Sequence, residues 1–267
     1  MPLRTITVLK SSYFEDNDDT VDNTVNNAAN NAVNNDINNS IHTAHLNHNS
    51  IHYEIGVDEA GRGPMLGRVY ASAVVLPKSM EQFNHTLMKD SKKFHSEKKI
   101  KEVAAYIKEH AIAWSVQYCD EGVIDKINIR NATHQAMHAA ISEVMEQLTQ
   151  INQAEKGAPE HKIILLVDGN DFTPFMDSSS LTGEKVSHVC IEGGDNTYSC
   201  IAAASILSKV SRDEYIAELC AVHPILNEHY GILKNKGYGT QIHMDGIKQH
   251  GITPFHRKSF GICRTFK

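Results

Sequence analysis

A run of five apolar residues at positions 163–167 constrains the fold more than any other feature of this sequence. The run is too short for an amphipathic helix and ends at an Asp-Gly-Asn turn, so it predicts a β-strand. Because every residue in it is apolar, both faces of the strand must be covered, which is typical of central strands in parallel sheets. We therefore expect a sheet with such a strand at its centre.

The segments around this strand complete a mixed sheet. An apolar stretch at 55–57 and the run 69–76 flank a Gly-rich turn and predict a β-hairpin. Further strands are expected at 111–118 and 186–191. Helical spacing of apolar residues predicts helices over 96–110, 128–149, 197–210, 211–221 and 240–250. Strands that first form a meander and then alternate with helices indicate an α/β fold, a mixed sheet flanked by helices.

The composition changes near residue 51. Residues 17–50 are dominated by Asn, which recurs in pairs every four residues and is a poor former of helices and strands. The small apolar residues between these pairs cannot bury enough surface to offset the entropy of ordering the chain. We therefore expect residues 1–50 to form a disordered Asn-rich tail, whose removal leaves activity intact, and residues 51–267 to form the folded domain.

Four histidines mark the end of this tail, at His42, His45, His48 and His52. Spacings of three, three and four residues would put several imidazoles on one face of a helix, where they could bind a metal. Histidines in low-complexity tracts lack the hydrogen-bond partners that orient metal ligands. We favour the simpler interpretation that the tract is rich in His as well as Asn.

Cysteine usage and hydropathy exclude secreted and membrane-spanning proteins. The 5 cysteines are odd in number and include no C-x-x-C pair, which excludes a disulfide framework and favours a reducing compartment. No apolar run approaches the length of a membrane span, about 18 residues. The N-terminus is too short and polar for a signal peptide, and acidic residues in the tail argue against a mitochondrial transit peptide. We expect a soluble, cytoplasmic protein.

The formal net charge of −6 argues at first against a nucleic-acid partner, because phosphate-binding proteins are usually basic. The distribution of the charge removes this objection. The tail holds two basic and six acidic residues, whereas residues 234–267 hold seven basic residues and one acidic residue. The C-terminal part therefore has the positive charge that phosphate binding requires.

Four acidic residues follow predicted strands: Asp58 and Glu59 after the first, Asp168 after the central strand, and Asp195 after the last. Each alone has a local explanation, as a turn residue or, for Asp195, a helix cap. Together they would gather at one edge of the sheet, where packed carboxylates repel one another unless a cation neutralises them. Oxygen-only ligands suit Mg²⁺ or Mn²⁺, and two such ions can promote displacement at a phosphodiester.

The residues around the first two carboxylates resemble a family signature. The stretch Gly56-Val57-Asp58-Glu59-Ala60-Gly61-Arg62-Gly63-Pro64 is similar to that of the ribonuclease HII family, among the type 2 ribonucleases H. Further matching blocks follow in order, including Asp90-Ser91-Lys92-Lys93, Leu166-Val167-Asp168-Gly169-Asn170, Gly194-Asp195, Gly237-Tyr238-Gly239-Thr240 and His256-Arg257-Lys258-Ser259-Phe260. The resemblance extends over residues 53–260, and the intact Gly-Arg-Gly loop favours type HII over type HIII.

The resemblance implies a fold, a reaction and a cofactor. The fold is an RNase H-like mixed sheet with a helical C-terminal part, and residues 51–267 form its catalytic domain. The reaction is hydrolysis of the RNA strand of RNA–DNA hybrids and nicking 5′ of ribonucleotides embedded in duplex DNA, which leaves 3′-hydroxyl and 5′-phosphate ends. This activity implies a role in ribonucleotide removal, DNA replication and repair. The family's four carboxylates, which hold two Mg²⁺ or Mn²⁺ ions, match Asp58, Glu59, Asp168 and Asp195.

The resemblance also implies residues that contact the substrate. The loop Gly61-Arg62-Gly63 can approach the minor groove, where a 2′-hydroxyl distinguishes RNA from DNA. Tyr238, between two glycines, would stack on a sugar or base. Lys92, Lys93, Lys209 and Arg212 are candidates for phosphate contacts. The alternatives are a tight turn for the loop, surface packing for Tyr238 and a solvated face for the lysines.

Partners and competing functions remain as expectations. The expected partners are RNA–DNA hybrids and ribonucleotide-containing duplex DNA, with no membrane. We expect a monomer without a sliding-clamp peptide, while a need for accessory subunits stays open. Two other functions compete: a catalytically idle hybrid-binding protein, which the four retained carboxylates argue against, and a related nuclease that cleaves branched DNA. A nicking assay on duplex DNA with one ribonucleotide distinguishes the ribonuclease from the binding protein, whereas the related nuclease would cleave ribose-free branched DNA.

Overall fold

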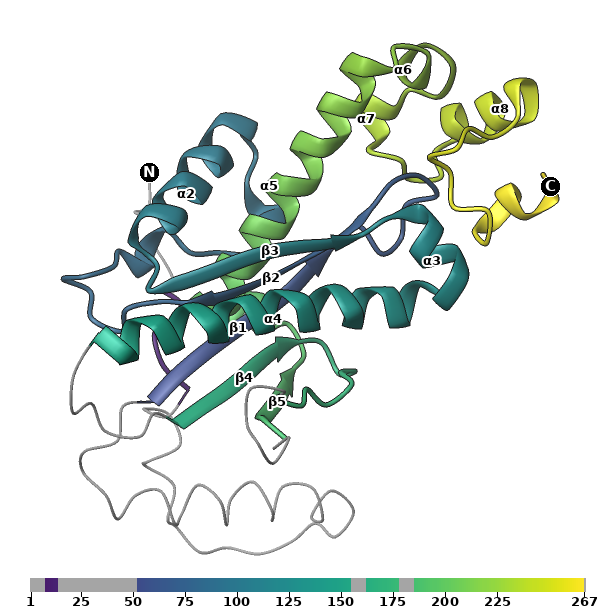
Figure 1. Cartoon of the computed structure of the whole chain (residues 1–267). Helices are drawn as coiled ribbons and strands as arrows, with labels where there is room; N and C mark the ends of the chain where they lie inside the picture. Colours follow the sequence, from purple (N-terminus) through teal and green to yellow (C-terminus); the bar gives the residue numbers. More distant parts are fainter. Residues whose placement is uncertain (1–7, 14–51, 155–161, 178–184, 267) are drawn as a thin grey trace, which may run out of the picture.

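The computed structural model describes residues 8–13, 52–154, 162–177 and 185–266, which include one mixed sheet with helices on both faces (Figure 1). The strands lie in the order β3-β2-β1-β4-β5. Their bounds are His52–Ala60 for β1, Val69–Val75 for β2, Ala113–Cys119 for β3, Lys162–Asp168 for β4 and Ser187–Ile191 for β5. Strand β2 is antiparallel to β1 and β3, whereas β4 is parallel to β1 and β5. The predicted α/β fold is confirmed, and the apolar strand β4 lies between two others.

Long helices cover both faces of the sheet. Helix α4 (Ile129–Ala154) packs on one face, and helices α2 (Glu97–His110) and α5 (Ser199–Val222) pack on the other (Figure 1). The Ala-rich start of α5 approaches β1 so closely that a Cβ on Gly56 would lie 2.2 Å from the carbonyl carbon of Cys200. Small residues at this crossing therefore allow the helix to pack directly against the strand that carries Asp58.

The C-terminal part forms a helical lobe beyond the carboxyl end of β1 (Figure 1). Its elements are α6 (Ile225–Tyr230), α7 (Ile232–Asn235), α8 (Gln241–His250) and the 3-10 helix η4 (Gly261–Thr265). The loop after β1 enters this lobe, where Leu66 is fully buried and pairs with His256 in an isolated β-bridge. The lobe thereby holds the loop that follows the first two carboxylates.

Two predictions about element boundaries are wrong. The helices predicted over 197–210 and 211–221 are one continuous helix, α5, because no Gly or Pro interrupts it. The charged Arg212 can be buried at the middle of this helix because its side chain bonds to backbone oxygens outside α5. Strand β1 runs through Asp58 and Glu59, and β4 ends at Asp168, so these carboxylates belong to the strands and do not follow them.

Several short elements lie outside the predicted set. They are α3 (Glu121–Ile127), α6, α7 and the 3-10 helices η1 (His85–Leu87), η2 (Ser91–Lys93), η3 (Gly194–Asn196) and η4. One or two turns do not establish the helical period in a sequence, so their positions depend on capping and packing.

Residues 8–13 contact the folded domain, although the sequence places them in the tail. Lys10 forms a parallel bridge with Tyr198, and Leu9 is buried in the core between the sheet and α5. The expectation of disorder therefore does not hold for these six residues. The remaining tail, with His42, His45 and His48, lies outside the described residues, as does the side chain of His52.

Two other expectations can be compared with the described residues. All five cysteines carry free thiols, in agreement with the absence of a disulfide framework. Within the described ranges, no helix combines the length and the apolar character that crossing a membrane would need.

Candidate active site

Parallel pairing of β1 with β4 brings the candidate carboxylates together. Asp58 and Asp168 each lie one step beyond the last aligned pair of these adjacent strands. Asp195 lies in η3, directly after β5, and its backbone N–H donates to Asp168 Oδ1 at 3.4 Å. Glu59 follows Asp58 in β1. The end of the sheet at which β1 and β4 finish, here called the carboxylate edge, thus carries all four acidic residues that the sequence singled out.

Burial and mutual repulsion raise the pKa of Asp58 well above its ordinary value. The side chain is 5% exposed, and desolvation is the largest cause, followed by the charges of Glu59 and Asp168. A hydrogen bond with the Ser205 side chain and one from the Glu59 N–H, at 2.7 Å, act in the opposite direction. The surrounding donors therefore stabilise the carboxylate only in part.

The neighbouring carboxylates show the same excess of negative charge. Burial raises the pKa of Glu59, and Asp168 raises it further, while the Arg62 guanidinium, 3.3 Å from Glu59 Oε1, opposes both. Burial and then Asp168 raise the pKa of Asp195, with Lys92 acting against them. The cluster holds more negative charge than the nearby cations neutralise.

The donor chemistry of this edge fits a hard divalent cation. The four side chains offer only carboxylate oxygens, the ligands that Mg²⁺ and Mn²⁺ prefer, and a bound cation would relieve the repulsion that, together with burial, raises the pKa values of Asp58, Glu59 and Asp195. Within the described ranges, no group of three or more His, Cys, Asp or Glu side chains is already arranged to bind a metal ion. The four carboxylates therefore lie at the same end of the sheet but do not yet surround a single position.

The Gly-Arg-Gly loop lies directly beside this edge and beneath Tyr238. Gly61 has a φ of +94°, and a Cβ there would lie 2.2 Å from Arg212 Nε, so both backbone conformation and space require glycine. A Cβ on Gly63 would lie 3.4 Å from Tyr238 Cε1, which places the half-exposed tyrosine ring against the loop. Residues 175 positions apart in sequence thus form one surface beside the carboxylates.

A buried arginine that the sequence analysis did not assign to the site holds this loop. Arg257 is fully buried, and burial lowers its pKa to about 9, with the charge of Arg212 a further cause. Its guanidinium donates to the carbonyl oxygens of Gly61 at 2.6 Å, Gly67 at 2.7 Å, Pro64 at 2.8 Å and Arg62 at 3.0 Å. The only sequence indication was its place in a matching C-terminal block.

Arg212 has a similar supporting position. The side chain is 3% exposed and donates to the carbonyl oxygens of Lys236 at 2.9 Å, Arg68 at 3.3 Å and Leu66 at 3.4 Å. A guanidinium enclosed by backbone carbonyls is not presented to a phosphate. The predicted phosphate contact at Arg212 therefore disagrees with its placement, which joins α5 to the loop and the C-terminal lobe.

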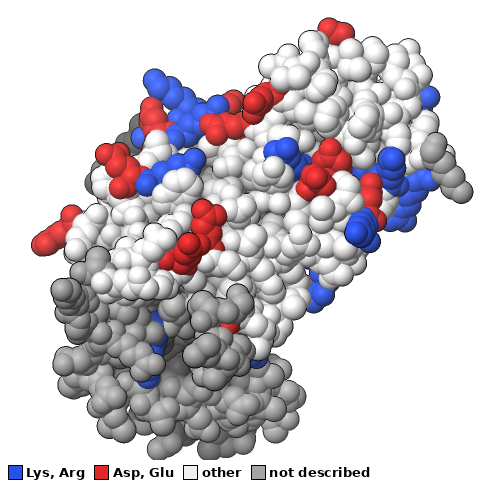
Figure 2. Space-filling model, viewed as in Figure 1, with Lys and Arg blue, Asp and Glu red and all other residues white. Residues whose placement is uncertain are grey.

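The lysines predicted to contact phosphate lie near the carboxylate edge. Burial opposes the charge of Lys92, but Asp195 and other carboxylates outweigh it and raise its pKa. Lys93 bonds to Asn196 Oδ1, beside Asp195. Lys209 on α5 pairs with Asp213 at 2.6 Å. Figure 2 shows that Lys and Arg side chains gather over α2 and near the C-terminal lobe, interspersed with acidic residues.

Two serines of α5 support Asp58, a role that the sequence did not indicate. The Ser208 hydroxyl lies 3.1 Å from the backbone carbonyl oxygen of Asp58 and 2.8 Å from the Ser72 hydroxyl. Ser205, which bonds the Asp58 side chain, also lies 3.0 Å from the Ser91 hydroxyl. Both serines are buried one turn apart, so the helix fixes the strand and its carboxylate together.

Comparison with known proteins assigns the family. A model of the ribonuclease HII family matches residues 55–263, which include the carboxylates, the loop, Arg257 and Tyr238. The chain belongs to the ribonuclease HII family. Ribonuclease HII from Parabacteroides distasonis is 45% identical over 207 residues, which cover 78% of this chain and 89% of that protein. Ribonuclease HII from Oceanobacillus iheyensis is 40% identical over 219 residues, 82% of this chain and 72% of that protein.

Solved structures show the same fold at lower identity. Ribonuclease H2 from Pyrococcus horikoshii matches with a TM-score of 0.58 and 22% identity, over 80% of this chain and 96% of that one. Ribonuclease HII from Archaeoglobus fulgidus, solved in complex with PCNA, matches with a TM-score of 0.56 and 23% identity, over 79% of this chain and 96% of that one. Membership of the ribonuclease HII family makes the chain a ribonuclease H, an endonuclease that acts on RNA–DNA hybrids.

Proposed function

We propose that this chain hydrolyses the RNA strand of RNA–DNA hybrids and nicks 5′ of ribonucleotides embedded in duplex DNA, leaving 3′-hydroxyl and 5′-phosphate ends. One observation carries the proposal: the mutually repelling carboxylates Asp58, Glu59, Asp168 and Asp195 share an edge with the Gly-Arg-Gly loop. This juxtaposition puts a site for cations next to a backbone surface that can contact ribose.

The four carboxylates would hold Mg²⁺ or Mn²⁺, as two ions. Bound there, the cations would activate water for attack on the scissile phosphate and stabilise the negative charge that develops on it. The protein's own contribution is orientation: Ser205 and Ser208 fix Asp58, and the Asp195 N–H holds Asp168. Lys92, which lies in the field of these carboxylates, would contact a substrate phosphate at the same edge.

Substrate choice would reside in the loop and Tyr238. The Arg257 guanidinium donates hydrogen bonds to four carbonyl oxygens in the loop and the residues that follow it, through Gly67. The loop would therefore enter the minor groove in a fixed conformation. Backbone groups of Gly61, Arg62 and Gly63 can then bond a 2′-hydroxyl, the group that distinguishes ribose from deoxyribose. The Tyr238 ring, 50% exposed beside Gly63, would stack on a neighbouring sugar or base. This choice of substrate would place the enzyme in ribonucleotide removal during DNA replication and repair.

The test is a nicking assay with the purified full chain. Duplex DNA that carries one ribonucleotide and a uniform RNA–DNA hybrid are incubated with Mg²⁺, with Mn²⁺ or with EDTA, and an all-DNA duplex of the same sequence is the control. We expect one cut 5′ of the ribonucleotide that requires a divalent ion and the 2′-hydroxyl. Binding of either substrate without a cut under both metals would leave only a hybrid-binding protein. Cleavage confined to ribose-free branched DNA would overturn the proposal in favour of a resolvase.

A further inference from the structure

The short segment of residues 8–13, here called the strap, lies outside the family match at 55–263 yet pairs with Tyr198, three residues after Asp195. It forms two backbone hydrogen bonds with the segment between η3 and α5. The Lys10 N–H donates to the Thr197 carbonyl oxygen at 2.9 Å, and the Ser199 N–H donates to the Lys10 carbonyl oxygen at 2.9 Å. The strap is therefore paired as a strand would be, on both sides of Tyr198.

The strap completes the N-terminus of α5. The first N–H groups of a helix have no acceptor within the helix, and a Ser, Thr, Asp or Asn at the cap position commonly supplies one. In α5 the cap residue is Tyr198, whose side chain makes no capping hydrogen bond. The carbonyl oxygen of Lys10 accepts the N–H of Ser199, the first helical residue. A segment nearly 190 residues away in sequence thus supplies the hydrogen-bond acceptor that a capping side chain usually provides.

The same contact fixes the turn that carries Asp195. The Thr197 and Tyr198 N–H groups both donate to the Gly194 carbonyl oxygen, at 2.9 and 2.8 Å, so η3 and the start of α5 form one tight turn. The Asn196 side chain in this turn donates to Asp195 Oδ1 at 2.8 Å. The strap bonds Thr197, two residues after Asp195, and so adds a hydrogen bond to the exit of this turn.

A second set of contacts joins the strap to β1, the strand that carries Asp58. The Ser12 hydroxyl donates to Glu54 Oε1 at 2.6 Å, and the Tyr13 N–H donates to Glu54 Oε2 at 2.9 Å. Glu54 is 5% exposed and also pairs with Lys78 at 3.0 Å, so its carboxylate is fully engaged. The strap consequently spans two elements, each of which carries a carboxylate of the candidate active site.

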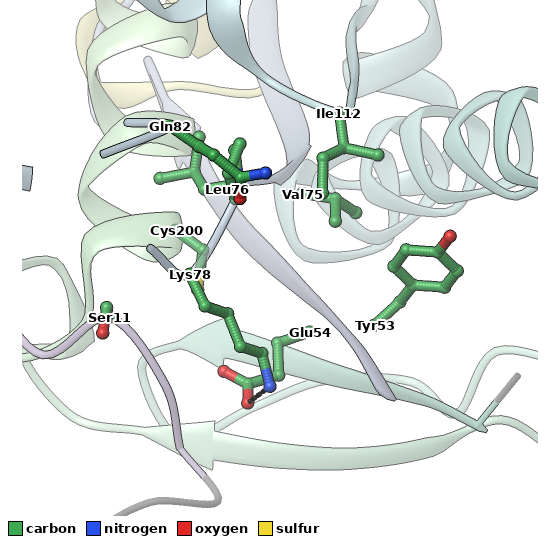
Figure 3. A pocket seen from close by; sticks show the side chains of 10 residues that line it. Ser11, Tyr53, Glu54, Val75, Leu76, Lys78, Gln82, Ile112 and Cys200 are labelled. Carbon is green, nitrogen blue, oxygen red and sulfur yellow. Dashed lines mark hydrogen bonds and ion pairs between the residues drawn. The ribbon is translucent and has the colours of Figure 1, made fainter. Parts of the chain in front are cut away.

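The strap also forms one wall of a cavity of about 160 Å³ at the amino end of the sheet. Figure 3 shows Ser11 of the strap at one side of this pocket, whose other lining residues include Glu54, Lys78 and Cys200, the second residue of α5. Burial, with the nearby Glu54 charge, raises the pKa of the Cys200 thiol to about 12, so it packs as a neutral group. The cavity therefore lies behind the strap and beside the start of α5, which also packs directly against β1 at Gly56.

We propose that the strap is a positioning element of the active site: it fixes Asp195 relative to Asp58 by joining the η3–α5 turn to β1. The inference rests on the proposed function, because it assumes that both residues hold the catalytic cations. It also replaces the expectation that residues 1–50 can be removed without consequence. The strap touches no reacting group, so its effect is on the geometry of the carboxylates.

The test compares two N-terminal truncations of the full chain. One starts at residue 14 and lacks the strap, and the matched control starts at residue 8 and keeps it. Mn²⁺ binding is measured by titration calorimetry without nucleic acid, and kcat and KM are measured on duplex DNA with one ribonucleotide. We expect loss of the strap to weaken Mn²⁺ binding and lower kcat by about 10-fold to 100-fold with KM little changed, as for other groups that orient metal ligands. The control should match the full chain.

Rescue separates positioning from simple instability. A synthetic peptide of residues 5–16, added to the strapless protein, should restore Mn²⁺ affinity and kcat, whereas the same peptide with Leu9→Asp should not, because Leu9 is buried in the core. If the strapless protein does not fold, Ser12→Ala in the full chain loses the Glu54 hydrogen bond and should show a smaller change of the same kind. Unchanged Mn²⁺ affinity and kcat in a folded strapless protein, or in Ser12→Ala, would overturn the inference.

The design distinguishes failure of the strap from failure of the proposed function. If the full chain and the control bind Mn²⁺ but cut no ribonucleotide-containing duplex, the proposed function fails, and the Mn²⁺ titration still decides whether the strap positions the carboxylates. If neither protein binds Mn²⁺, both proposals fail.

Discussion

Two charged clusters of opposite sign lie side by side, and they are stabilised in opposite ways. The acidic cluster at the sheet edge has raised pKa values at Asp58, Glu59 and Asp195, since burial and like charges are only partly offset. The basic cluster of Arg212 and Arg257 is also buried, but backbone carbonyl oxygens surround both guanidinium groups. The acidic cluster has too little positive charge around it, whereas the backbone of the same chain supplies hydrogen-bond acceptors to both arginines.

The difference shows which cluster awaits a ligand. A buried charge whose hydrogen bonds are satisfied by the backbone serves the fold, because binding an outside group would require breaking those bonds. A group of carboxylates that remains short of counter-charge gains free energy when a cation arrives. We therefore assign chemistry to the acidic edge and support to the arginines, and four experiments can sharpen or break this division.

The largest effect is expected from Asp58→Asn. Losing one cation ligand should lower kcat on ribonucleotide-containing duplex by about 1,000-fold, the equivalent of several kcal/mol of transition-state stabilisation. The folded protein should nevertheless become more stable without metal at neutral pH. Because folding raises the pKa of Asp58, the ionised carboxylate costs stability above that pKa, and the amide carries no such cost.

Single-turnover cleavage and thermal unfolding in EDTA measure the two effects on Asp58→Asn. Asp245→Asn, an exposed carboxylate on α8, is the control and should change neither. A fall in the melting temperature of metal-free Asp58→Asn would show that the protein stabilises this carboxylate, which would contradict the assignment of the acidic cluster to cation binding.

Arg257→Met should destabilise the fold by about 3–5 kcal/mol, the range found when one partner of a buried charged network is removed. The substitution leaves four loop carbonyl oxygens without their donor. Urea unfolding measures the free energy of unfolding, and Arg264→Met, an exposed arginine in η4, should change it by less than about 0.5 kcal/mol. A fully stable Arg257→Met protein would show that the buried arginine does not support the loop.

Tyr238→Ala should weaken substrate recognition by about 1–3 kcal/mol, the range for loss of one stacking contact, or about 5-fold to 150-fold in kcat/KM. Stability should change little, because the ring is 50% exposed. Tyr118→Ala, which removes a ring exposed by 47% on β3, is the matched control in the same kinetic assay. Equal losses in the two variants would make Tyr238 an ordinary surface residue.

The last effect, which is absent at neutral pH, is a pH dependence from the lobe behind Tyr238. Burial, with a contribution from His243, lowers the pKa of His256 to about 3 from an ordinary value of 6.5. As pH falls from 6.5 toward 3, the unfolded state takes up a proton that the folded state does not, so the free energy of unfolding falls. The slope from this group is at most about 1.4 kcal/mol per pH unit.

Comparison of wild type with His256→Gln isolates this slope. Glutamine can accept the Thr253 N–H and donate to His243, as the neutral imidazole does, but it does not titrate. The acidic cluster has the opposite dependence in both proteins, since its raised pKa values favour folding as pH falls. Identical slopes of unfolding free energy between pH 4 and 6.5 would show that His256 does not titrate as its burial implies.

Much of this site could be anticipated from the sequence, and particular residues show where that ended. The apolar run at 163–167 predicted a strand inside the sheet, which is β4, although β1 is the strand at the centre, and the four carboxylates were found because parallel strands end at a common edge. Arg257 could not be identified by its type, since a lysine-rich and arginine-rich segment resembles a phosphate-binding surface. Arg212 was predicted to contact phosphate, whereas the carbonyl oxygens that surround it belong to two distant segments, the loop at Leu66 and Arg68 and the lobe at Lys236.

The sequence by itself determined which segments form strands and helices and to which family the chain belongs. It also determined that Asp58, Glu59, Asp168 and Asp195 lie near strand ends. These depend on local periodicity and on motifs that a few consecutive residues define. Only the tertiary structure showed which Lys and Arg side chains face the solvent and which are enclosed by backbone carbonyl oxygens. It also showed that residues 8–13 join β1 to the turn that carries Asp195. The reason is physical: burial and hydrogen-bond partners arise from contacts between distant segments, and no local pattern of residue types encodes which carbonyl a buried arginine or a helix N–H will meet.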